Sequence, residues 1–245
     1  MNILSPLGDP IGRPVAGWQP AQRPLREDAN GRWCALEALT PDEHAAALYD
    51  AYGEDGEGRI WTYLPYGPFD SLAAFTEWLE AIAPGEDPMF FAIRDASDGR
   101  IGGLGSYLRI NPEMGSIEIG HLNFSPRLQK KQAATEALHL MIRRAFALGY
   151  RRCEWKCDAL NAGSRRAAAR LGFTFEGIHR QAAVVKGRNR DTAWFSILDR
   201  DWPALQQAHE AWLADDNFDA QGRQAARLSA LTSPLNAARG GDASF

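Results

Sequence analysis

The amino-acid sequence predicts an α/β domain with a mixed sheet that is mostly antiparallel at its start. Amphipathic helical segments alternate with apolar strand segments along the chain. Short turns, DGR at 98–100 and NPEMG at 111–115, separate three consecutive strand segments, as in antiparallel hairpins. With 245 residues, 45% hydrophobic and 24% charged, the chain suffices for one large domain with appendages.

The first half of the chain is predicted to contain an arm, a strand, two helices and a three-stranded meander. The arm is rich in Pro and Gly and lacks periodicity. The first helix has Thr40 as its cap, Pro41 at its first position and Glu43 at the capping-box position. In order, the predicted elements are an extended arm over 1–32, a strand over 34–39, helices over 41–52 and 71–82, and strands over 89–95, 101–110 and 116–124.

The second half is predicted to alternate helix and strand before a helical extension. Gly149 and Gly172 end two helices as C-caps. The predicted elements are a helix over 133–148, a strand over 151–157, a short helix before residue 172, a strand pair over 173–198, a C-terminal helical extension over 203–231 with its second helical run near 221–231, and a disordered tail over 232–245. Trp212, Leu213 and Leu228 are candidates for burial, either on the domain or in a dimer.

Charge is distributed unevenly along the chain. The formal net charge is −4, yet residues 125–190 hold fifteen Lys and Arg against four Asp and Glu, a local balance of +11. The remainder holds 12 basic and 27 acidic residues and therefore carries −15. Such a surplus forms either solvent-exposed charged surfaces or a binding site for an anionic ligand. A small polyphosphate fits better than nucleic acid, because the sequence has no recognised nucleic-acid-binding motif.

The strand SIEIGHLNF changes the phase of its alternation. Ile117 and Ile119 occupy odd positions, whereas Leu122 and Phe124 occupy even ones. A strand with one buried face keeps one phase, so we expect a β-bulge between Ile119 and Leu122, with Gly120 inside it. A weakly paired edge strand is the alternative. A bulge would free backbone N–H groups that can bind a ligand carbonyl.

Two longer segments contain this strand and the helices that follow. They are EIGHLNFSPRLQKKQAATEAL and LGYRRCEWKCDALNAGSRRAAARLGFTFEG. Their strand-turn-helix at 117–137 is followed by N-x-x-S and L-G-F, formed by Asn161, Ser164, Leu171, Gly172 and Phe173. In this order the motifs resemble the GNAT acyltransferase superfamily, within it the ribosomal-protein N-terminal acetyltransferases and their relatives. The resemblance covers about residues 33–202 and implies a GNAT fold with a bulged, splayed cofactor-binding strand and flanking helices.

The resemblance implies acetyl-CoA as the acyl donor. In the family the bulged strand presents N–H groups to the thioester carbonyl, and the next helix N-terminus binds the pyrophosphate. The matching strand positions are His121, Leu122, Asn123 and Phe124, and the turn positions are Gln129, Lys130, Lys131, Gln132, Ala133 and Ala134. Asn161 matches a contact to the cofactor arm and is equally an ordinary helix N-cap.

The phosphate turn departs from the family pattern at one position. The family has Q/R-x-x-G-x-G/A, and this chain has Gln132 in place of the middle glycine. Glycine allows close backbone approach to a ligand at φ > 0. If Gln132 keeps φ < 0, its N–H still points at phosphate and only the closeness of approach changes. Lys130 and Lys131 add positive charge, so we expect the site to survive.

The resemblance also implies an acid and a base. Glu118 matches a glutamate that acts as general base, and Ser164 matches a serine proposed to protonate the leaving thiolate. The alternatives are a surface carboxylate for Glu118 and a helix cap for Ser164. Backbone N–H groups near His121 and Leu122 would stabilise the oxyanion.

The aromatic segment WTYLPYGPF lies in the region that covers the acceptor in this superfamily. Aromatic side chains on a loop either wall a substrate pocket or close over the core. The candidate acceptor contacts are Trp61, Tyr63, Tyr66, Phe69 and Arg109, with Tyr107 and residues 186–192 as further ones.

Other classes of protein lack support in the sequence. No apolar run approaches the ~18 residues of a membrane span, and the N-terminus lacks a secretory pattern. Three cysteines and five scattered histidines indicate a reducing cytoplasm and no metal site. The G-x-S-x-G, P-loop and Rossmann motifs are absent.

We therefore predict a cytoplasmic acetyl-CoA-dependent N-acetyltransferase that acts by direct attack in a ternary complex. It is expected to be a monomer or homodimer without nucleic-acid or membrane partners. Its acceptor is a small amine, an amino-acid-like compound or a protein N-terminus. The alternatives are transfer of another acyl group, and a non-catalytic CoA-binding sensor or interaction module, which the altered turn favours.

Overall fold

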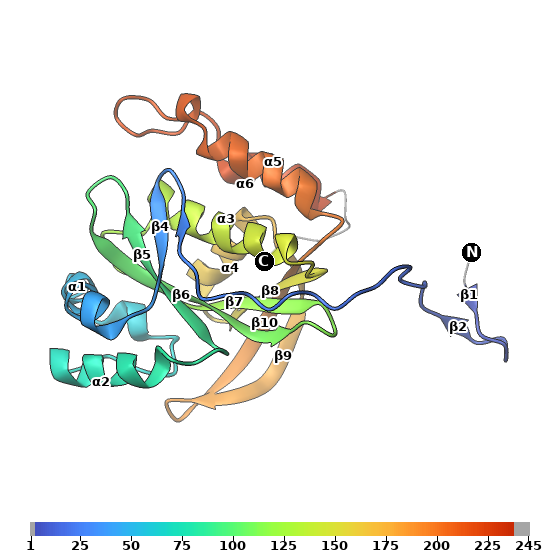
Figure 1. Cartoon of the computed structure of the whole chain (residues 1–245), viewed down its shortest axis with the longest axis horizontal. Coiled ribbons are helices and arrows are strands. Elements are labelled where there is room, and N and C mark those ends of the chain that lie inside the picture. Colours follow the sequence, from blue (N-terminus) through green and yellow to red (C-terminus); the bar gives the residue numbers. More distant parts are fainter. Residues whose placement is uncertain (1–2, 238–245) are drawn as a thin grey trace.

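The computed structural model describes residues 3–237 and contains one eight-stranded central sheet (Figure 1). Its strands are β3 (Ala29–Asn30), β4 (Cys34–Ala38), β5 (Met89–Asp95), β6 (Ile101–Asn111), β7 (Ser116–Phe124), β8 (Arg152–Asp158), β9 (Thr174–Val185) and β10 (Arg188–Leu198). Their order across the sheet is β3-β4-β5-β6-β7-β8-β10-β9. Every neighbouring pair is antiparallel except β7 and β8, which run parallel. The predicted mixed, mostly antiparallel sheet is confirmed.

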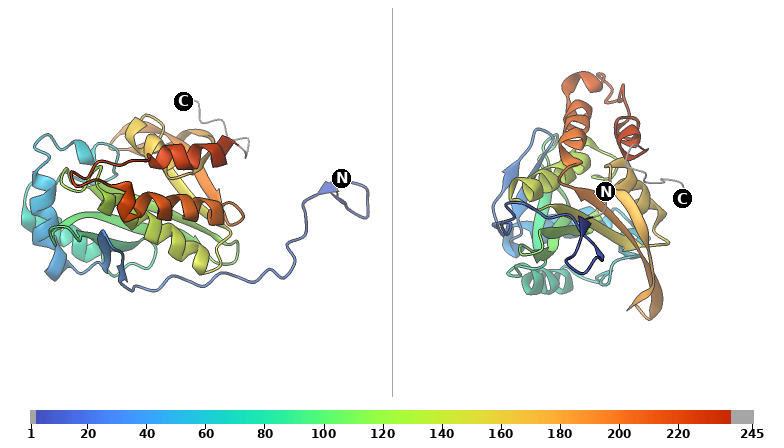
Figure 2. Two further views of the ribbon diagram at one scale, coloured as in Figure 1. Left: turned by 90° about the horizontal axis from the view of Figure 1, so that it is seen from above. Right: turned by 90° about the vertical axis from the view of Figure 1, so that its right-hand side faces the viewer.

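Helices cover both faces of this sheet (Figures 1 and 2). They are α1 (Pro41–Gly53), α2 (Leu72–Ile82), α3 (Gln132–Ala147), α4 (Ala162–Arg170), α5 (Trp202–Leu213) and α6 (Leu228–Ala237), with short 3₁₀ turns η1 (Arg59–Trp61) and η2 (Asp215–Asn217). Helices α1 and α2 lie on one face, α3 and α4 lie on the other, and α5 and α6 pack outside α3 and α4. Within residues 3–237, no helix is long and apolar enough to cross a membrane.

Each face of the sheet has its own hydrophobic core, and β5 serves both. Phe91 and Ile93 pack in the core under α3, whereas Phe90 and Ala92 pack in the core under α1 and α2. A strand that is buried on both faces is apolar at successive positions rather than alternating ones. This burial explains the continuous apolar run MFFAI.

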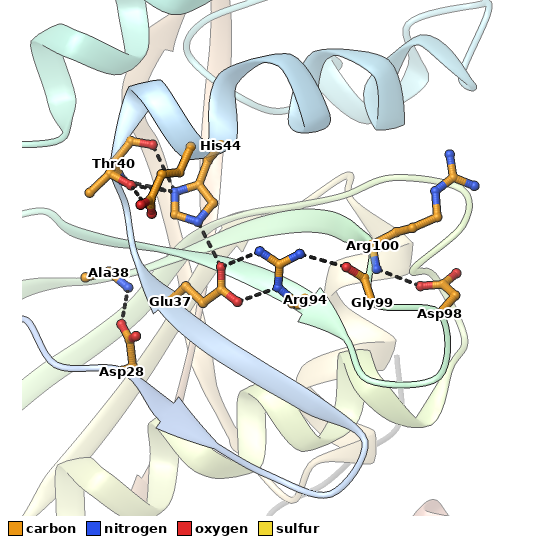
Figure 3. Close-up of polar contacts among 10 residues, drawn as sticks. Asp28, Glu37, Ala38, Thr40, His44, Arg94, Asp98, Gly99 and Arg100 are labelled. Atoms are coloured by element: carbon orange, nitrogen blue, oxygen red, sulfur yellow. Dashed lines mark hydrogen bonds and ion pairs between the residues drawn. The ribbon is translucent and has the colours of Figure 1, made fainter.

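The start of α1 is held by polar contacts that the capping-box prediction described only in part (Figure 3). The Thr40 N–H donates to His44 Nδ1 at 3.0 Å, and the Thr40 hydroxyl donates to the Glu43 carboxylate at 3.0 Å. His44 therefore occupies the backbone donor that a capping box would assign to Glu43. Beyond it, Glu37 contacts His44 Nε2 at 2.9 Å and Arg94 Nη2 at 2.8 Å, and the Arg94 guanidinium lowers the pKa of Glu37.

The predicted N-terminal arm leads away from the body of the protein in its first part. Strands β1 (Ile3–Leu4) and β2 (Pro10–Ile11) form a small hairpin there (Figures 1 and 2). Contact with the body begins at Trp18, whose ring lies 5.7 Å from the Arg151 guanidinium, and at Ala21, whose N–H donates to a backbone carbonyl. The last residues of the predicted arm form β3 and thus belong to the central sheet.

The C-terminal extension packs on the domain. Trp212, Leu213 and Leu228 are 5%, 8% and 1% exposed, and all three join the core under α3. Their predicted burial is confirmed, and it takes place within one chain.

The second helix of the extension lies further along the chain than predicted. The expected helical run near 221–231 is observed as α6, over Leu228–Ala237. The prediction of disorder from residue 232 is therefore wrong as far as 237, because α6 packs on α4 and α5. Thr232 is fully buried, and its hydroxyl donates to the Arg170 carbonyl at 3.1 Å. The remainder of the predicted tail, 238–245, lies outside the described residues.

Two buried histidines join α5 to α3. His209 Nε2 donates to the Leu171 carbonyl at 2.8 Å, so its Nδ1 is the acceptor for His139 Nδ1, 3.3 Å away. Burial lowers the pKa of each imidazole to about 4. Both rings are therefore neutral in the folded protein near pH 7.

We predict that these histidines make the protein less stable in mild acid. Their folded pKa values lie below the ordinary value, so between pH 6.5 and 4 the unfolded chain binds protons that the folded chain does not, and stability falls as pH falls. A His139→Met variant removes one of these titrations. Its melting temperature should fall less than that of the wild type between pH 7 and 5, as measured by circular dichroism. Identical pH dependence in both proteins would contradict this account.

Candidate active site

The ladder between β7 and β8 ends after three residue pairs. β8 continues beside β10, and β7 continues beside β6, but the two strands no longer pair with each other. The three pairs are Ser116–Arg152, Ile117–Cys153 and Glu118–Glu154. The facing edges of β7 and β8 are therefore splayed beyond these pairs, as the family resemblance implied.

A bulge lies on β7 at the start of the splayed part. Between the pairs Ser106–Gly120 and Leu104–Asn123, β7 has one residue more than β6. This confirms the bulge expected between Ile119 and Leu122. The residue with positive φ is His121, at 50°, and not Gly120. The extra residue leaves backbone groups outside the ladder.

His121 lies in an aromatic environment on the face of the sheet that α1 and α2 cover. Its Nδ1 is 3.1 Å from the Tyr66 hydroxyl, the two rings are stacked 5.7 Å apart, and Phe90 lies 5.3 Å away. Burial, followed by the charges of Arg109 and Arg190, lowers the pKa of His121. The imidazole is therefore neutral at pH 7 and can accept a proton or a hydrogen bond.

The aromatic segment 61–69 bridges the two sides of the splay. Its Tyr66 contacts the bulge of β7, as described above. On the other side, the Tyr63 hydroxyl donates to the Leu160 carbonyl, in the loop after β8, at 3.2 Å. Lys186, at the tip of the β9–β10 hairpin, donates to the Trp61 carbonyl at 2.9 Å. The segment thus joins β7, the β8–α4 loop and the hairpin.

The four aromatic residues predicted to contact the acceptor separate into two pairs. Trp61 is 5% exposed and packs in the core under α1 and α2, with Tyr52 at 5.1 Å and Phe69 at 5.5 Å. Trp61 and Phe69 thus close over the core, which is the alternative to lining a substrate pocket. Tyr63 and Tyr66 reach the two sides of the splay. Tyr107 lies on the opposite face, buried under α3.

Glu118 is buried and paired with two cations. Its Oε2 accepts from Arg109 Nη1 at 3.0 Å and from Lys156 Nζ at 2.9 Å. The side chains of Glu118 and Lys156 are only 6% and 4% exposed. Lys156 also lies 2.6 Å from Glu154 and 3.7 Å from the centre of the Trp194 ring. Glu118 is therefore not the surface carboxylate of the alternative interpretation.

Sequence reasoning did not select Lys156. The alternation in RRCEWKC places Lys156 and Glu154 on one face, opposite Cys153 and Cys157. That pattern identifies a polar face but not a contact with β7. The contact follows only from the register of β8 beside β7.

The turn before α3 keeps part of the predicted phosphate-binding geometry. Lys131 is the N-cap, and Gln132 is the first helical residue and lies outside the positive-φ set. The left-handed residue of the turn is Lys130, at φ 64°. Lys130 is exposed, whereas Lys131 Nζ binds the Asp95 carboxylate at 2.7 Å. Of the two expected charges, only that of Lys130 is left for a phosphate.

The remaining turn residues fix the helix terminus in place. Gln129 donates from its amide to the Phe124 carbonyl at 2.8 Å and so ties the turn to the end of β7. Ala133 and Ala134 are buried in the core under α3. The first N–H groups of a helix have no partner within the helix and favour an anion there.

Asn161 and Ser164 lie at the start of α4, on the β8 side of the splay. Asn161 Oδ1 accepts the Ser164 N–H at 3.0 Å, so Asn161 is the N-cap of α4. Ser164 Oγ accepts the Trp155 indole N–H at 3.0 Å, and the Ser164 hydroxyl also interacts with the Cys157 thiol, lowering its pKa against the larger effect of burial.

The three cysteines are free and buried, and burial raises the pKa of each thiol, Cys157 included. Within residues 3–237, no three His, Cys, Asp or Glu side chains gather so as to hold a metal ion.

Comparisons with known proteins agree with this geometry. Residues 35–174 match the model of the acetyltransferase (GNAT) domain family. A GCN5-related N-acetyltransferase from Brucella melitensis is similar in structure, with a TM-score of 0.87 and 44% identity over 89% of this chain and 100% of that chain. An uncharacterized N-acetyltransferase p20 of Bacillus licheniformis is 29% identical over 156 residues, 62% of this chain and 85% of that protein.

The predicted branch of the superfamily also occurs among the similar structures. A structure described as a putative ribosomal-protein-serine acetyltransferase from Vibrio cholerae has a TM-score of 0.61 and 19% identity, and it covers 70% of this chain and 97% of that one. At this identity the likeness concerns the fold alone.

We predict that Gln132→Gly tightens CoA binding by a few-fold. The half-buried Gln132 side chain stands at the first position of α3, where its removal allows closer backbone approach to phosphate. Calorimetric titration with CoA measures the change. Gln132→Ala is the matched control, since it removes the side chain without adding backbone freedom. Weaker binding to the glycine variant would mean that the Gln132 side chain itself contacts the phosphates.

Proposed function

Because this chain belongs to the GNAT acetyltransferase family, whose members are acetyl-CoA-dependent N-acetyltransferases, we propose that it transfers acetyl to a primary amine by direct attack in a ternary complex. The observation that carries the proposal is the splay between β7 and β8, which begins next to the bulge at His121. It offers the edge of a strand to an extended ligand. The N-terminus of α3 lies beyond the end of the same strand, where a pyrophosphate would bind.

The reaction requires that the amine lose a proton. An aliphatic amine with a pKa of about 10 is only about one part in a thousand neutral at pH 7, a penalty of roughly 4 kcal/mol. In our proposal, Glu118 accepts this proton, directly or through water, and the amine nitrogen attacks the thioester carbonyl. The buried position of Glu118 next to the bulge supports its role as the base.

Collapse of the intermediate breaks the carbon–sulfur bond, the nitrogen gives its second proton to solvent, and acetylated amine and CoA thiolate remain. Glu118 then releases the first proton to solvent. Backbone N–H groups near His121 and Leu122 are proposed to stabilise the oxyanion. Ser164 is proposed to give its hydroxyl proton to the thiolate, because the Trp155 N–H already occupies its acceptor side. Solvent then restores the proton to Ser164.

A second candidate function is a CoA-binding sensor without turnover. One observation favours it. Glu118 accepts from both Arg109 and Lys156, so it also serves as the counter-ion of a buried cation. In a sensor, Glu118 would serve only as this counter-ion and would not act as a base.

Titration with acetyl-CoA, beside CoA and dephospho-CoA, followed by an assay of CoA release with a panel of amines, tests the proposed function. Micromolar binding with turnover of at least one amine is the expected result. Binding without turnover of any amine would favour the sensor. Absence of binding at millimolar ligand would overturn both functions.

We predict that Glu118→Gln lowers kcat at least tenfold and changes the pH–rate profile, because general-base catalysis typically contributes 10²–10⁴-fold. The Kd for acetyl-CoA should stay within about twofold. Glu113→Gln, on the exposed turn before β7, is the matched control and should keep full activity. Unchanged kcat across pH in the Glu118 variant would remove Glu118 from the base role and leave His121 as the acceptor of the proton.

A further inference from the structure

Arg190 is a half-buried arginine on β10 without a partner. Its Nε is buried and has no hydrogen-bond partner, and no ion pair within residues 3–237 includes its guanidinium. The side chain shares a face of β10 with Trp194, four residues on, whose partner across the ladder is Lys156. That face is the one on which Glu118 and His121 lie. A half-buried charge without a counter-ion is unusual and calls for an explanation.

Arg190 lies close to the splay between β7 and β8. Its charge contributes to lowering the pKa of His121 on β7 and acts in the same direction on Cys157 on β8. The β9–β10 hairpin that carries it extends beyond the rest of the sheet (Figure 1). At the hairpin tip, Lys186 is bonded to the Trp61 carbonyl, so the hairpin is fixed against the aromatic segment 61–69.

Three other cations on this face are neutralised by carboxylates. Arg109 and Lys156 share Glu118, and Arg152 binds Glu176. Half-buried Arg190 has no such carboxylate partner among residues 3–237. An anionic ligand group is the partner that its planar guanidinium suits, because it can bind a carboxylate through two parallel hydrogen bonds.

Two more buried polar groups on this face are also without partners. They are the side-chain amide of Asn123 and the indole N–H of Trp194. Asn123 follows the bulge by one residue and pairs with Leu104, which packs under α1 and α2. Buried donors without acceptors are rare in native proteins, so their presence on the face that carries His121 indicates a ligand rich in hydrogen-bond acceptors.

We propose that the acceptor amine carries a carboxylate, which Arg190 binds while the amino group is held near the β7 bulge. The acceptor class is therefore free amino acids and related amino carboxylates, rather than plain amines or protein N-termini. This inference rests on the proposed function, because it names the acceptor of that same site.

The deciding comparison uses one amino acid, its carboxamide and its decarboxylated amine. The twenty common L-amino acids are first screened for CoA release, and the most active one is then compared with its two analogues. The carboxamide is a demanding control, because removing the negative charge lowers the pKa of its ammonium group and leaves more neutral amine to react. A preference for the acid over the amide thus has to come from binding.

The variants are Arg190→Met, Arg190→Lys and the matched control Arg180→Met, which removes the same charge from an exposed position of the same hairpin. Loss of a charge-assisted hydrogen-bonded pair is expected to raise KM for the amino acid about tenfold or more in Arg190→Met. Its kcat/KM for the decarboxylated amine should stay within twofold. Arg190→Lys should recover part of the loss, and Arg180→Met should behave as the wild type.

Calorimetric binding of the same three compounds to the CoA-loaded protein separates this inference from the proposed function. Arg190-dependent binding of the amino acid without acetyl transfer would support the carboxylate site and overturn the proposed function. Transfer to all three compounds alike would support the function and overturn the carboxylate site. An Arg190→Met variant that loses affinity for CoA itself would assign Arg190 to the CoA phosphates and overturn the inference. Better transfer to peptides, unaffected by Arg190→Met, would overturn it as well.

Discussion

The candidate site depends on one constraint, the early end of the β7–β8 ladder. A parallel ladder that continued would pair the backbone groups of both strands and leave nothing for an extended ligand to bind. Here β7 stays with β6, β8 stays with β10, and the extra residue at His121 bends β7 as the two part. The aromatic segment 61–69 bridges the opening between β7 and β8, because it is hydrogen-bonded to β7, to the β8–α4 loop and to the β9–β10 hairpin.

The bulge that accompanies this constraint can be predicted from the local sequence. A change of alternation phase between Ile119 and Leu122 predicts the bulge, because each residue of a strand commits the next one to the opposite face. The strand bounds 89–95 and 116–124 also match the structure. The choice of His121 rather than Gly120 for the positive φ is different. It depends on the Tyr66 and Phe90 rings that surround the imidazole, and these come from distant segments.

Contacts between strands and between layers lie beyond what local pattern can predict. Lys156 contacts Glu118 only because of the register between β7 and β8. The aromatic segment 61–69 has no regular periodicity, so the sequence does not show which of its side chains enter the core and which reach the site. Helix α6 was placed too early for a related reason. Its position is set by packing on α4 and α5, where Thr232 bonds to the Arg170 carbonyl, and not by its own amphipathic pattern.

The charge surplus of residues 125–190 shows how composition and electrostatics differ. Fifteen basic residues suggest a broad anion-binding surface, but in the folded protein several of them form ion pairs with carboxylates. Arg127 binds Asp50 and Glu54, and Lys131 binds Asp95. A cation that already has a counter-ion attracts a ligand weakly, because the pair has little net field at the distance of a ligand. What remains at the site is Lys130 at the phosphate turn and Arg190 over the splay. Neither Lys130 nor Arg190 has a carboxylate partner among the described residues, so each keeps its charge for an anionic group, which in our proposals is a CoA phosphate for Lys130 and the acceptor carboxylate for Arg190.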